Sequence, residues 1–545
     1  MFVKNPCKNM GTNQTDYASQ QTLVAALLDR YRFPHAAQSV RLLETHISWV
    51  LLAGRYAYKI KKALDLGFLD FTSLGARQFY CSEEIRLNRR LAPGIYLDVI
   101  PIGGKPDTPE FGAQPAIEYA VRMRRFATAK QMDHLLTRGK VLPQYMDKLA
   151  AMLAVFHGSL HQTEADSAFG TPATIRAAAM QNFEQLLCLL TAQSDRDAVA
   201  ELRLATANAY SACENFFGQR RAQGCVRECH GDLHLGNIVL IGKQPVPFDG
   251  IEFNPALRWI DVMDEVAFLV MDLLHGSRSD LAYRFLNAYL ETTGDYAGVS
   301  VLRFYLAYRA GVRAKVSAIR AFQPDHSQLL QTRALTACRS YLALAAECLS
   351  KHRPALIITH GLPGSGKSTF AQAALERLQA IRIRSDVERK RLFGMNPLDN
   401  SRSDTGNGIY SIDATRCTYT RLHELARDLL DAGFPVIVDA ACLKQDERAQ
   451  FHALALSMSV PFVIVDMKAS TATLRARIML RRNAASDASE ADLSVLKMLQ
   501  AAQQPLLSNE LVRTVEFLND ADHGGISADA AGWRRLDELL AVPEN

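Results

Sequence analysis

The chain has 545 residues, of which 48% are hydrophobic and 22% are charged. This composition is that of a folded globular protein and excludes a largely disordered chain, and the length favours more than one domain. The formal net charge of +5 is too small, over this length, to indicate nucleic acid or a membrane surface as a partner.

Two features of the sequence bear on the compartment. The first residues are polar and lack the apolar segment of a secretory signal, and no run of about 18 uncharged apolar residues predicts a membrane span. The ten cysteines are scattered without a CxxC pair, which is typical of reduced thiols and does not indicate a zinc site. We therefore expect a cytoplasmic protein.

The hydrophobic pattern divides the first part of the chain. Residues 1–25 predict a polar N-terminal tail, followed by a first domain over 26–350. Short apolar runs between glycines and prolines predict a small lobe at about 30–125, a sheet with one helix over Ser82–Leu91. Mostly helical patterns predict a large lobe at about 126–350, with a β-rich patch that includes Pro247–Phe253.

A lysine lies near the end of a predicted strand in the small lobe. Lys59 alternates with apolar neighbours in Tyr56–Ile60, so it faces away from them. In kinases a lysine in such a place binds the α- and β-phosphates of ATP and is held by a glutamate from a helix. Glu84 is the expected partner and Glu83 the second choice. The alternative is an exposed basic strand end.

A kinase-like loop follows in the large lobe. His230–Asn237 reads HGDLHLGN, which has the spacing HxDxxxxN, and Asp249 with its following glycine stands in the place of a DFG motif. Asp232 is predicted to accept the proton of the acceptor hydroxyl as a base. Asn237 and Asp249 are predicted to converge on Mg²⁺, and His230 is expected to brace the loop by hydrogen bonds.

These residues resemble the aminoglycoside phosphotransferase family, which phosphorylates hydroxyl groups of small compounds. The resemblance covers about 30–345 and implies a bilobal protein-kinase-like fold of the α+β class. By family position, backbone groups near Met123–Phe126 would contact adenine. Asp261 resembles the structural aspartate of that family.

The pattern changes after Lys351–Pro354. Short apolar strands alternate with helices over 354–545, which predicts a P-loop NTPase fold of the α/β class with a parallel sheet between two helical layers. Residues 361–369 read GLPGSGKST, stand between a predicted strand and the helix Ser368–Leu378, and fit the phosphate-loop motif GxxxxGK[ST]. The alternative is a glycine-rich turn without a ligand.

The motif predicts a role for the backbone N–H groups and for the polar side chains of the phosphate loop. Backbone N–H groups and the N-terminus of the following helix are expected to bind phosphate oxygens. Lys367 is expected to contact the β- and γ-phosphates, and the Ser368 hydroxyl to bind Mg²⁺. The residues expected to bind the nucleotide are Gly361, Gly364, Ser365, Gly366, Lys367, Ser368 and Thr369.

Further polar residues follow the predicted strands of this domain. Asp386 is predicted to be a catalytic base, with a helix N-cap formed by Ser385 or Asp386 as the alternative. Asp439 is predicted to hold Mg²⁺, with a strand-end turn residue as the alternative. Arg477 and Arg481, on one helix face, are predicted to neutralise the transferring phosphoryl group, with a solvated basic face as the alternative.

This part resembles the P-loop small-molecule kinases of the gluconate kinase, chloramphenicol phosphotransferase and zeta-toxin type, over roughly 354–520. Besides the phosphate loop, the segments that carry the resemblance are Ser385-Asp386-x-x-Arg389, Val438-Asp439-Ala440, and Arg477-x-x-x-Arg481 with Asp487-Ala-Ser-Glu-Ala. The resemblance implies that Asp386 is a candidate base and that Arg389 contacts the substrate. The order of the two domains resembles a family of bacterial fusion proteins.

Together these motifs predict a bifunctional ATP- and Mg²⁺-dependent phosphotransferase, a kinase that acts on hydroxyl groups of small molecules. The alternative is a nucleotide-gated regulatory protein in which one ATP-binding half controls the other. A kinase for nucleic-acid ends is disfavoured by the small net charge. Neither motif identifies the phosphoryl acceptor or an oligomeric state.

Overall fold

The computed structural model of the chain divides into two compact units. The first comprises Met1–Ala178 and Phe217–Asp272, and the second Ala179–Phe216 and Leu273–Asn545. The boundary expected at Lys351–Pro354 thus falls inside the second unit, and the proposed domain limits remain a prediction. The structure describes residues 11–12, 14–67, 69–323, 327–350, 353–397, 399, 401, 408–484, 492–520, 526 and 529–541. Among these, no helix is long and apolar enough to cross a membrane.

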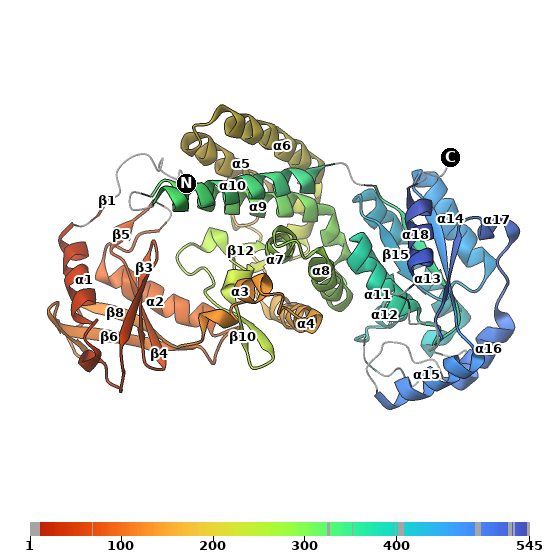
Figure 1. Cartoon of the computed structure of the whole chain (residues 1–545), viewed down its shortest axis with the longest axis horizontal. Coiled ribbons are helices and arrows are strands. Elements are labelled where there is room, and N and C mark those ends of the chain that lie inside the picture. The colour runs from red at the N-terminus through yellow and green to blue at the C-terminus, as the bar shows by residue number, and fades with distance from the viewer. Residues whose placement is uncertain are drawn as a thin grey trace. The chain divides into compact units, whose positions relative to one another are not determined.

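The first unit contains a six-stranded antiparallel sheet in the order β2-β3-β4-β8-β6-β7 (Figure 1). Helix α2 (Leu74–Asn88), capped by Ser73, packs against β6 and β8. Because β4 lies between β3 and β8, its side chains are in the middle of the sheet. The strands are β2 (Val40–Glu44), β3 (Ser48–Ala53), β4 (Tyr56–Lys61), β6 (Tyr96–Lys105), β7 (Thr108–Phe111) and β8 (Glu118–Arg124).

Part of the expected N-terminal tail is a helix, α1 (Gln14–Ala26). Its Leu23 and Val24 are buried in the core of the six-stranded sheet, where they share a cluster with Trp49. Gln20 donates hydrogen bonds to the carbonyl oxygen of Lys61 and to Glu118. A helix needs only one apolar face to pack on a core. The mostly polar composition of this segment therefore did not indicate a packed helix. Residues 1–10 lie outside the described part.

The rest of the first unit carries the kinase-like loop. Two short antiparallel pairs, β9 with β12 and β10 with β11, flank it. The strand expected over Pro247–Phe253 is wrong, because β11 ends at Pro247 and Asp249 adopts a left-handed φ of 63° that no strand accommodates. The elements here are α3 (Met132–Thr137), α4 (Pro143–Ser159), β9 (Val226–Glu228), β10 (Ile238–Ile241), β11 (Gln244–Pro247) and β12 (Trp259–Asp261).

Helices dominate the remaining segments of the chain up to residue 350, both before and after the kinase-like loop. Helices α9 and α10 pack along each other, and α8 packs against α11 of the C-terminal part. These helices are α5 (Pro172–Leu189), α6 (Gln193–Ala222), α7 (Val262–His275), α8 (Ser279–Thr293), α9 (Val299–Ala321) and α10 (Gln328–Leu349).

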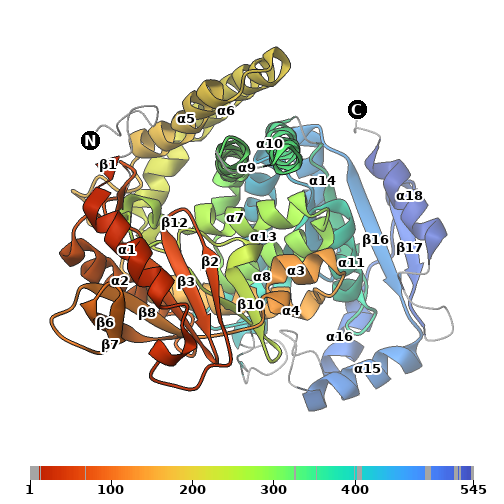
Figure 2. The same ribbon diagram turned by 60° about the vertical axis from the view of Figure 1, so that its left-hand side comes forward.

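The C-terminal part of the second unit is a five-stranded parallel sheet in the order β14-β15-β13-β16-β17. The predicted P-loop fold class is therefore confirmed. The strand β17 was not expected; Figure 2 shows it beside β16, with α18 (Ala530–Leu540) next to both. The strands are β13 (Leu356–His360), β14 (Ile381–Arg384), β15 (Val436–Asp439), β16 (Phe462–Lys468) and β17 (Thr514–Leu518).

Helices cover both faces of this sheet. On one face, Phe370 of α11 stacks on Trp533 of α18 at 5.3 Å between ring centroids. On the other, α13 packs against α14, and these two helices contact β13, β14 and β15. The phosphate loop follows the central strand β13, where polar strand ends meet. The remaining helices are α11 (Lys367–Leu378), α12 (Ser385–Leu392), α13 (Ile412–Asp431), α14 (Gln445–Met458), α15 (Thr471–Ala484), α16 (Leu493–Ala502) and α17 (Ser508–Leu511).

Candidate active sites

Lys59 contacts carboxylates from two distant segments of the first unit. Its Nζ lies 2.9 Å from Glu84 Oε1 on α2 and 2.6 Å from Asp249 Oδ1. Burial alone would lower the pKa of Lys59, but the charges of Asp249 and Glu84 raise it well above its ordinary value. The ammonium group is therefore charged and held in place, as phosphate binding requires. The second choice, Glu83, instead pairs with Arg86 at 2.8 Å.

A second lysine that the sequence reasoning missed is buried beside the first. Lys61 Nζ donates to Glu84 Oε2 at 2.7 Å and pairs with Glu252. Burial would raise the pKa of Glu84, but the charges of Lys59 and Lys61 lower it to about 2. The signal was present in the sequence, because residues two apart on a strand share a face. The Glu84 carboxylate thus holds both lysines.

The backbone at Asp249 is held in an unusual conformation. Its φ of 63° lies in the left-handed region, which is costly for a residue with a side chain. The N–H of Asp249 donates to Tyr96 Oη at 3.0 Å, and the N–H of Gly250 donates to Asn88 Oδ1 at 2.7 Å. These bonds direct the Asp249 carboxylate to Lys59 while its side chain stays 44% exposed. A cation from solvent can therefore reach it.

The predicted base and one predicted metal ligand touch each other. Asn237 Nδ2 donates to Asp232 Oδ2 at 2.8 Å and to the Asp232 carbonyl oxygen at 3.1 Å. His234, to which the sequence assigned no role, has Nε2 3.5 Å from Asp232 Oδ2. The Asp232 side chain is 35% exposed, whereas Asn237 is buried. An acceptor hydroxyl can thus approach Asp232 from solvent.

A buried carboxylate holds the backbone of this loop. Glu265 accepts hydrogen bonds from the N–H of His230 at 3.1 Å and of Gly231 at 2.7 Å, and its Oε1 lies 3.0 Å from His157 Nε2. Burial would raise the pKa of Glu265, but the hydrogen bond and charge of His157 lower it to about 2. His157, Cys229 and Glu265 are near enough to share a metal. We assign them to bracing, because both Glu265 oxygens already accept backbone N–H groups.

Two further expectations concern the surroundings of the loop. Asp261 binds Arg220 through both carboxylate oxygens, at 2.7 and 2.8 Å, which suits a structural aspartate. His230 Nε2 lies 3.0 Å from the carbonyl oxygen of Phe248, and burial lowers the pKa of this histidine. In the segment expected near adenine, Phe126 packs edge-on against Phe248 at 4.8 Å.

The phosphate loop is built from backbone in left-handed conformations. Gly361, Gly364 and Gly366 have φ values of 144°, 85° and 100°. A Cβ on Gly366 would come within 1.9 Å of Asn519 Nδ2, so this position requires glycine. The Asn519 amide donates to the Ser365 carbonyl oxygen at 2.9 Å. Asn519, which the sequence reasoning missed, therefore fixes the loop from β17's end.

Polar atoms in and beside this loop suit a phosphate and a divalent cation. Lys367 Nζ donates to the carbonyl oxygens of Gly361 and Leu362, both at 3.0 Å. Ser365 Oγ and Asp439 Oδ2 are buried and have no hydrogen-bond partner among the residues that the structure describes. Hydroxyl and carboxylate oxygens are the donors that Mg²⁺ prefers. The residues present thus fit Mg²⁺-nucleotide chemistry.

The predicted acids lie at the ends of neighbouring strands. Asp439 ends β15, and Thr359 on β13 bonds both backbone groups of Ala440, at 2.7 and 3.1 Å, which fixes that strand end beside the phosphate loop. Asp386 is the second residue of α12. The alternative that Ser385 or Asp386 caps this helix is wrong, because the helix begins at Ser385 and Arg384 occupies the cap position. Ser368 and Thr369 lie in the first turn of α11.

Two of the arginines that the sequence singled out donate hydrogen bonds to backbone carbonyl oxygens. Arg477 donates to the carbonyl oxygens of Gly364 at 3.1 Å and Asn519 at 2.7 Å, so it braces the phosphate loop. Arg481 is on the same helix, α15, but its side chain lies outside the described part, as does the Asp487-Ala-Ser-Glu-Ala segment. Arg389 is buried and donates to the carbonyl oxygen of Ile409 at 3.0 Å.

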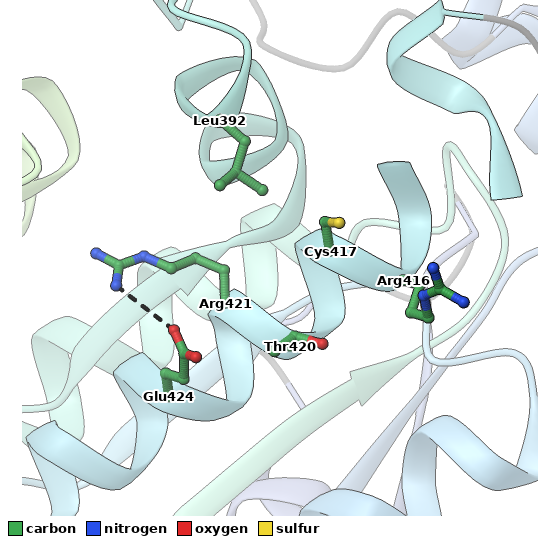
Figure 3. A pocket seen from close by; sticks show the side chains of 6 residues that line it. All are labelled: Leu392, Arg416, Cys417, Thr420, Arg421 and Glu424. Atoms are coloured by element: carbon green, nitrogen blue, oxygen red, sulfur yellow. Dashed lines mark ion pairs between the residues drawn. The ribbon is translucent and has the colours of Figure 1, made fainter. Parts of the chain in front are cut away.

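A surface pocket lies between the end of α12 and the exposed face of α13. Figure 3 shows Arg421 and Glu424 pointing toward each other there, at 3.8 Å. None of the lining residues is among those that the sequence singled out. The pocket is lined by Leu392, Arg416, Cys417, Thr420, Arg421 and Glu424.

Comparison with known proteins gives relatives of most of the chain. It is 31% identical over 462 residues to the uncharacterized protein Rv2004c of Mycobacterium tuberculosis and, equally, to the uncharacterized protein Mb2027c of Mycobacterium bovis. Each match covers 84% of this chain and 89% of the relative. A family described as AAA domain matches residues 356–506, which include the phosphate loop, Asp386, Asp439 and Arg477.

Solved structures are similar to each part of the chain separately. A choline/ethanolamine kinase family protein from Mesorhizobium loti covers 62% of this chain and 98% of its own, with 14% identity and a TM-score of 0.36. A gluconokinase from Sinorhizobium meliloti covers 35% of this chain and 91% of its own, with 19% identity and a TM-score of 0.23. The recognition of a phosphotransferase-like domain followed by a P-loop kinase domain is confirmed.

Proposed function

Because the chain belongs to the same family as the uncharacterized mycobacterial proteins Rv2004c and Mb2027c, and combines two kinase-type sites, we propose that it is a bifunctional phosphotransferase. Each site would use ATP and Mg²⁺ and transfer phosphate to a hydroxyl group of a small molecule. The observation that carries this proposal is two sets of side-chain contacts in the first unit. Lys59 contacts Glu84 and Asp249, and Asp232 contacts Asn237.

In the first site, each residue would have a separate role in phosphate transfer. Lys59, held by Glu84, would bind the nucleotide phosphates. Asp232 would orient the acceptor hydroxyl and take its proton as the oxygen bonds to the γ-phosphorus, while the bond from that phosphorus to the bridging oxygen breaks and ADP leaves. Asn237 and Asp249 would hold Mg²⁺, which neutralises phosphate charge when bound.

In the second site, the backbone of residues 361–369 would bind the phosphates and Lys367 would add positive charge. Asp386 would accept the proton of its acceptor, since it stands at the end of the strand beside β15. Ser368 and Asp439 would hold Mg²⁺. Arg477 supports the loop that binds the nucleotide, and Arg481 remains a candidate for neutralising the transferred group.

A screen of metabolite extracts tests this proposal. The full-length chain is incubated with an extract, ATP and Mg²⁺, and products are sought that gain the mass of one phosphate. We expect one set of products to disappear in Asp232→Ala and another in Lys367→Ala. Products that persist in the double variant would not be made by these sites, and the absence of any phosphorylated product from diverse extracts would contradict the proposal.

A further inference from the structure

Helix α8, which precedes residue 350, covers the edge strand of the P-loop sheet. β14 is at the end of the strand order, so within the described ranges one of its sides has no neighbouring strand. Asn287 on α8 accepts a hydrogen bond from the N–H of Arg382 at 2.7 Å and donates to the Ala380 carbonyl oxygen at 2.9 Å. Figure 1 shows α8 beside α11 in the same region. One amide side chain thus satisfies backbone groups that an edge strand leaves open.

Four residues after Asn287, α8 presents a carboxylate to the same strand. Glu291 Oε2 lies 2.8 Å from an Arg382 nitrogen, and Glu291 Oε1 lies 2.7 Å from Arg384 Nη1. Burial would raise the pKa of Glu291, but the charges of the two arginines lower it. Glu291 is therefore ionised and holds both guanidinium groups of β14.

Arg384 connects this carboxylate to the P-loop site. Its Nε lies 3.6 Å from Asp439 Oδ2, the buried oxygen without a hydrogen-bond partner. The guanidinium group thus lies between the two carboxylates: it hydrogen-bonds to Glu291 and is farther from Asp439. A guanidinium group that is not held elsewhere prefers a two-point contact with a carboxylate, which would occupy both oxygens of Asp439.

We propose that Glu291 is a positioning residue for the P-loop site: it holds Arg384 away from full contact with Asp439, so that Asp439 can bind a divalent cation. This inference rests on the proposed role of Asp439 in holding Mg²⁺. Glu291 lies before Lys351 and outside the matched range 356–506. The P-loop site of this chain is therefore completed by a helix that belongs to the predicted first domain.

The test measures how nucleotide binding depends on Mg²⁺ in the full-length chain. A fluorescent ATP analogue is titrated at a series of Mg²⁺ concentrations, and binding that Lys367→Ala removes is assigned to the P-loop site. In Glu291→Gln, we expect the Mg²⁺ concentration for half-maximal binding to rise about tenfold, the size of one charge-assisted hydrogen bond. Arg384→Gln should leave this concentration unchanged or lower it, because it removes the competing cation.

The opposite direction of these two effects separates positioning from loss of structure, which would shift both variants the same way. The double variant Glu291→Gln/Arg384→Gln should behave like Arg384→Gln, since Glu291 acts through Arg384. Arg382→Gln is the matched control: it removes the other ion pair of Glu291 and should leave the Mg²⁺ dependence within about twofold of wild type. Melting without nucleotide reports the loss of stability in each variant.

Three results distinguish the possible failures. If Glu291→Gln and Arg382→Gln have the same Mg²⁺ dependence, or if Arg384→Gln raises the requirement for Mg²⁺, the inference about Glu291 is wrong. If Asp439→Asn does not change the Mg²⁺ dependence, the proposed role of Asp439 has failed instead. If Glu291→Gln does not fold, Glu291→Asp and Arg384→Gln provide the same comparison of directions.

Discussion

The two candidate sites of this chain are prepared for phosphate in opposite ways. In the first unit, side chains form the candidate phosphate site: Lys59 is held by Glu84 and Asp249, each from a different segment. In the P-loop site the backbone of residues 361–369 forms the candidate phosphate site, with glycines at φ values that other residues rarely adopt. The first arrangement depends on tertiary packing, whereas the second depends on a short continuous stretch of chain.

This difference predicts how each site responds to substitution. In the network of Lys59 and Lys61, the loss of one carboxylate leaves a buried positive charge without its partner, which is costly to the fold. In the phosphate loop, a change of side chain leaves the backbone N–H groups in place. Substitutions in this ion-pair network should therefore affect stability and activity together, whereas substitution of Lys367 in the phosphate loop should affect activity alone.

The largest effect is expected at the proposed base of the first site. Asp232→Ala should reduce acceptor-dependent phosphate transfer by ~10²–10⁴-fold, because the acceptor proton then has no base to receive it. ATP binding should remain, since Lys59 and its carboxylates are unchanged. Transfer rates with a phosphoryl acceptor found in extracts, together with nucleotide titration, check this. A rate within a factor of about three of wild type would remove Asp232 from the mechanism.

Adjacent glutamates on α2 provide the sharpest test of the ion-pair network. Glu84 is fully buried between Lys59 and Lys61, whereas Glu83 pairs with Arg86 nearer the surface. Glu84→Gln should lower the free energy of unfolding by about 3–5 kcal/mol, because it leaves buried charges unpaired. Glu83→Gln should cost less than about 1 kcal/mol.

Denaturant unfolding of the full-length chain measures both glutamate variants. The first unit must be followed by a probe of its own, such as hydrogen exchange in β4, because the chain has two compact units and a global signal would combine both. Equal losses in the two variants would contradict the role of Glu84 as the carboxylate shared by both lysines.

The matching substitution in the P-loop site should have no such effect on stability. Lys367→Ala should reduce nucleotide turnover at that site by about 10²-fold, since one preorganised positive group is lost. Melting without ligand should hardly change, because the glycine-rich backbone that shapes this loop is not altered by the substitution. A large fall in melting temperature would show that this site, too, depends on its side chains.

Turnover in Asp232→Ala, Lys367→Ala and the double variant then shows whether the sites work independently. Independent sites predict that each single variant keeps the turnover of the other site and that the double variant keeps none. If Lys367→Ala alone removes all turnover, one site controls the other, which is the regulatory alternative.

The features that sequence predicted well are contiguous. The phosphate loop needs only the order strand, glycines and helix within residues 355–378. In HGDLHLGN the proposed base and a proposed metal ligand, whose roles stay predictions, are five residues apart. Both the parallel P-loop sheet and the kinase-like domain follow from such local patterns. The Lys59–Glu84 pair was harder to predict from local patterns, because it joins a residue on a strand to a residue on a later helix.

The features that sequence did not predict join distant segments. Lys61 and Glu252 are 191 residues apart, and Arg384 and Glu291 are 93 apart. Charged residues are common in any sequence, and only tertiary packing selects which of them share a buried site. Helix α1 was missed for a related reason: its few inward-facing residues are recognised only once the sheet beneath them is known.

The smallest effect concerns the carboxylate that braces the kinase-like loop. Glu265→Gln keeps one acceptor oxygen and replaces the other with an amide group that faces a backbone N–H. This should lower the free energy of unfolding by about 1–3 kcal/mol, the cost of an unsatisfied buried donor. Glu265 belongs to the first unit and the P-loop site to the second, so turnover at the P-loop site should be unchanged and serves as the control.

The pH dependence of this loss identifies the carboxylate as its source. The pKa of Glu265 in the folded chain is lowered to about 2 from its ordinary value of 4.5, so its ionised form stabilises the fold above pH 4.5. That contribution disappears as the pH falls from 4.5 toward 2, whereas glutamine does not titrate. The difference in unfolding free energy between wild type and Glu265→Gln should therefore shrink as the pH falls below 4.5. A difference that grows in acid would show that the loop is not held by an ionised Glu265.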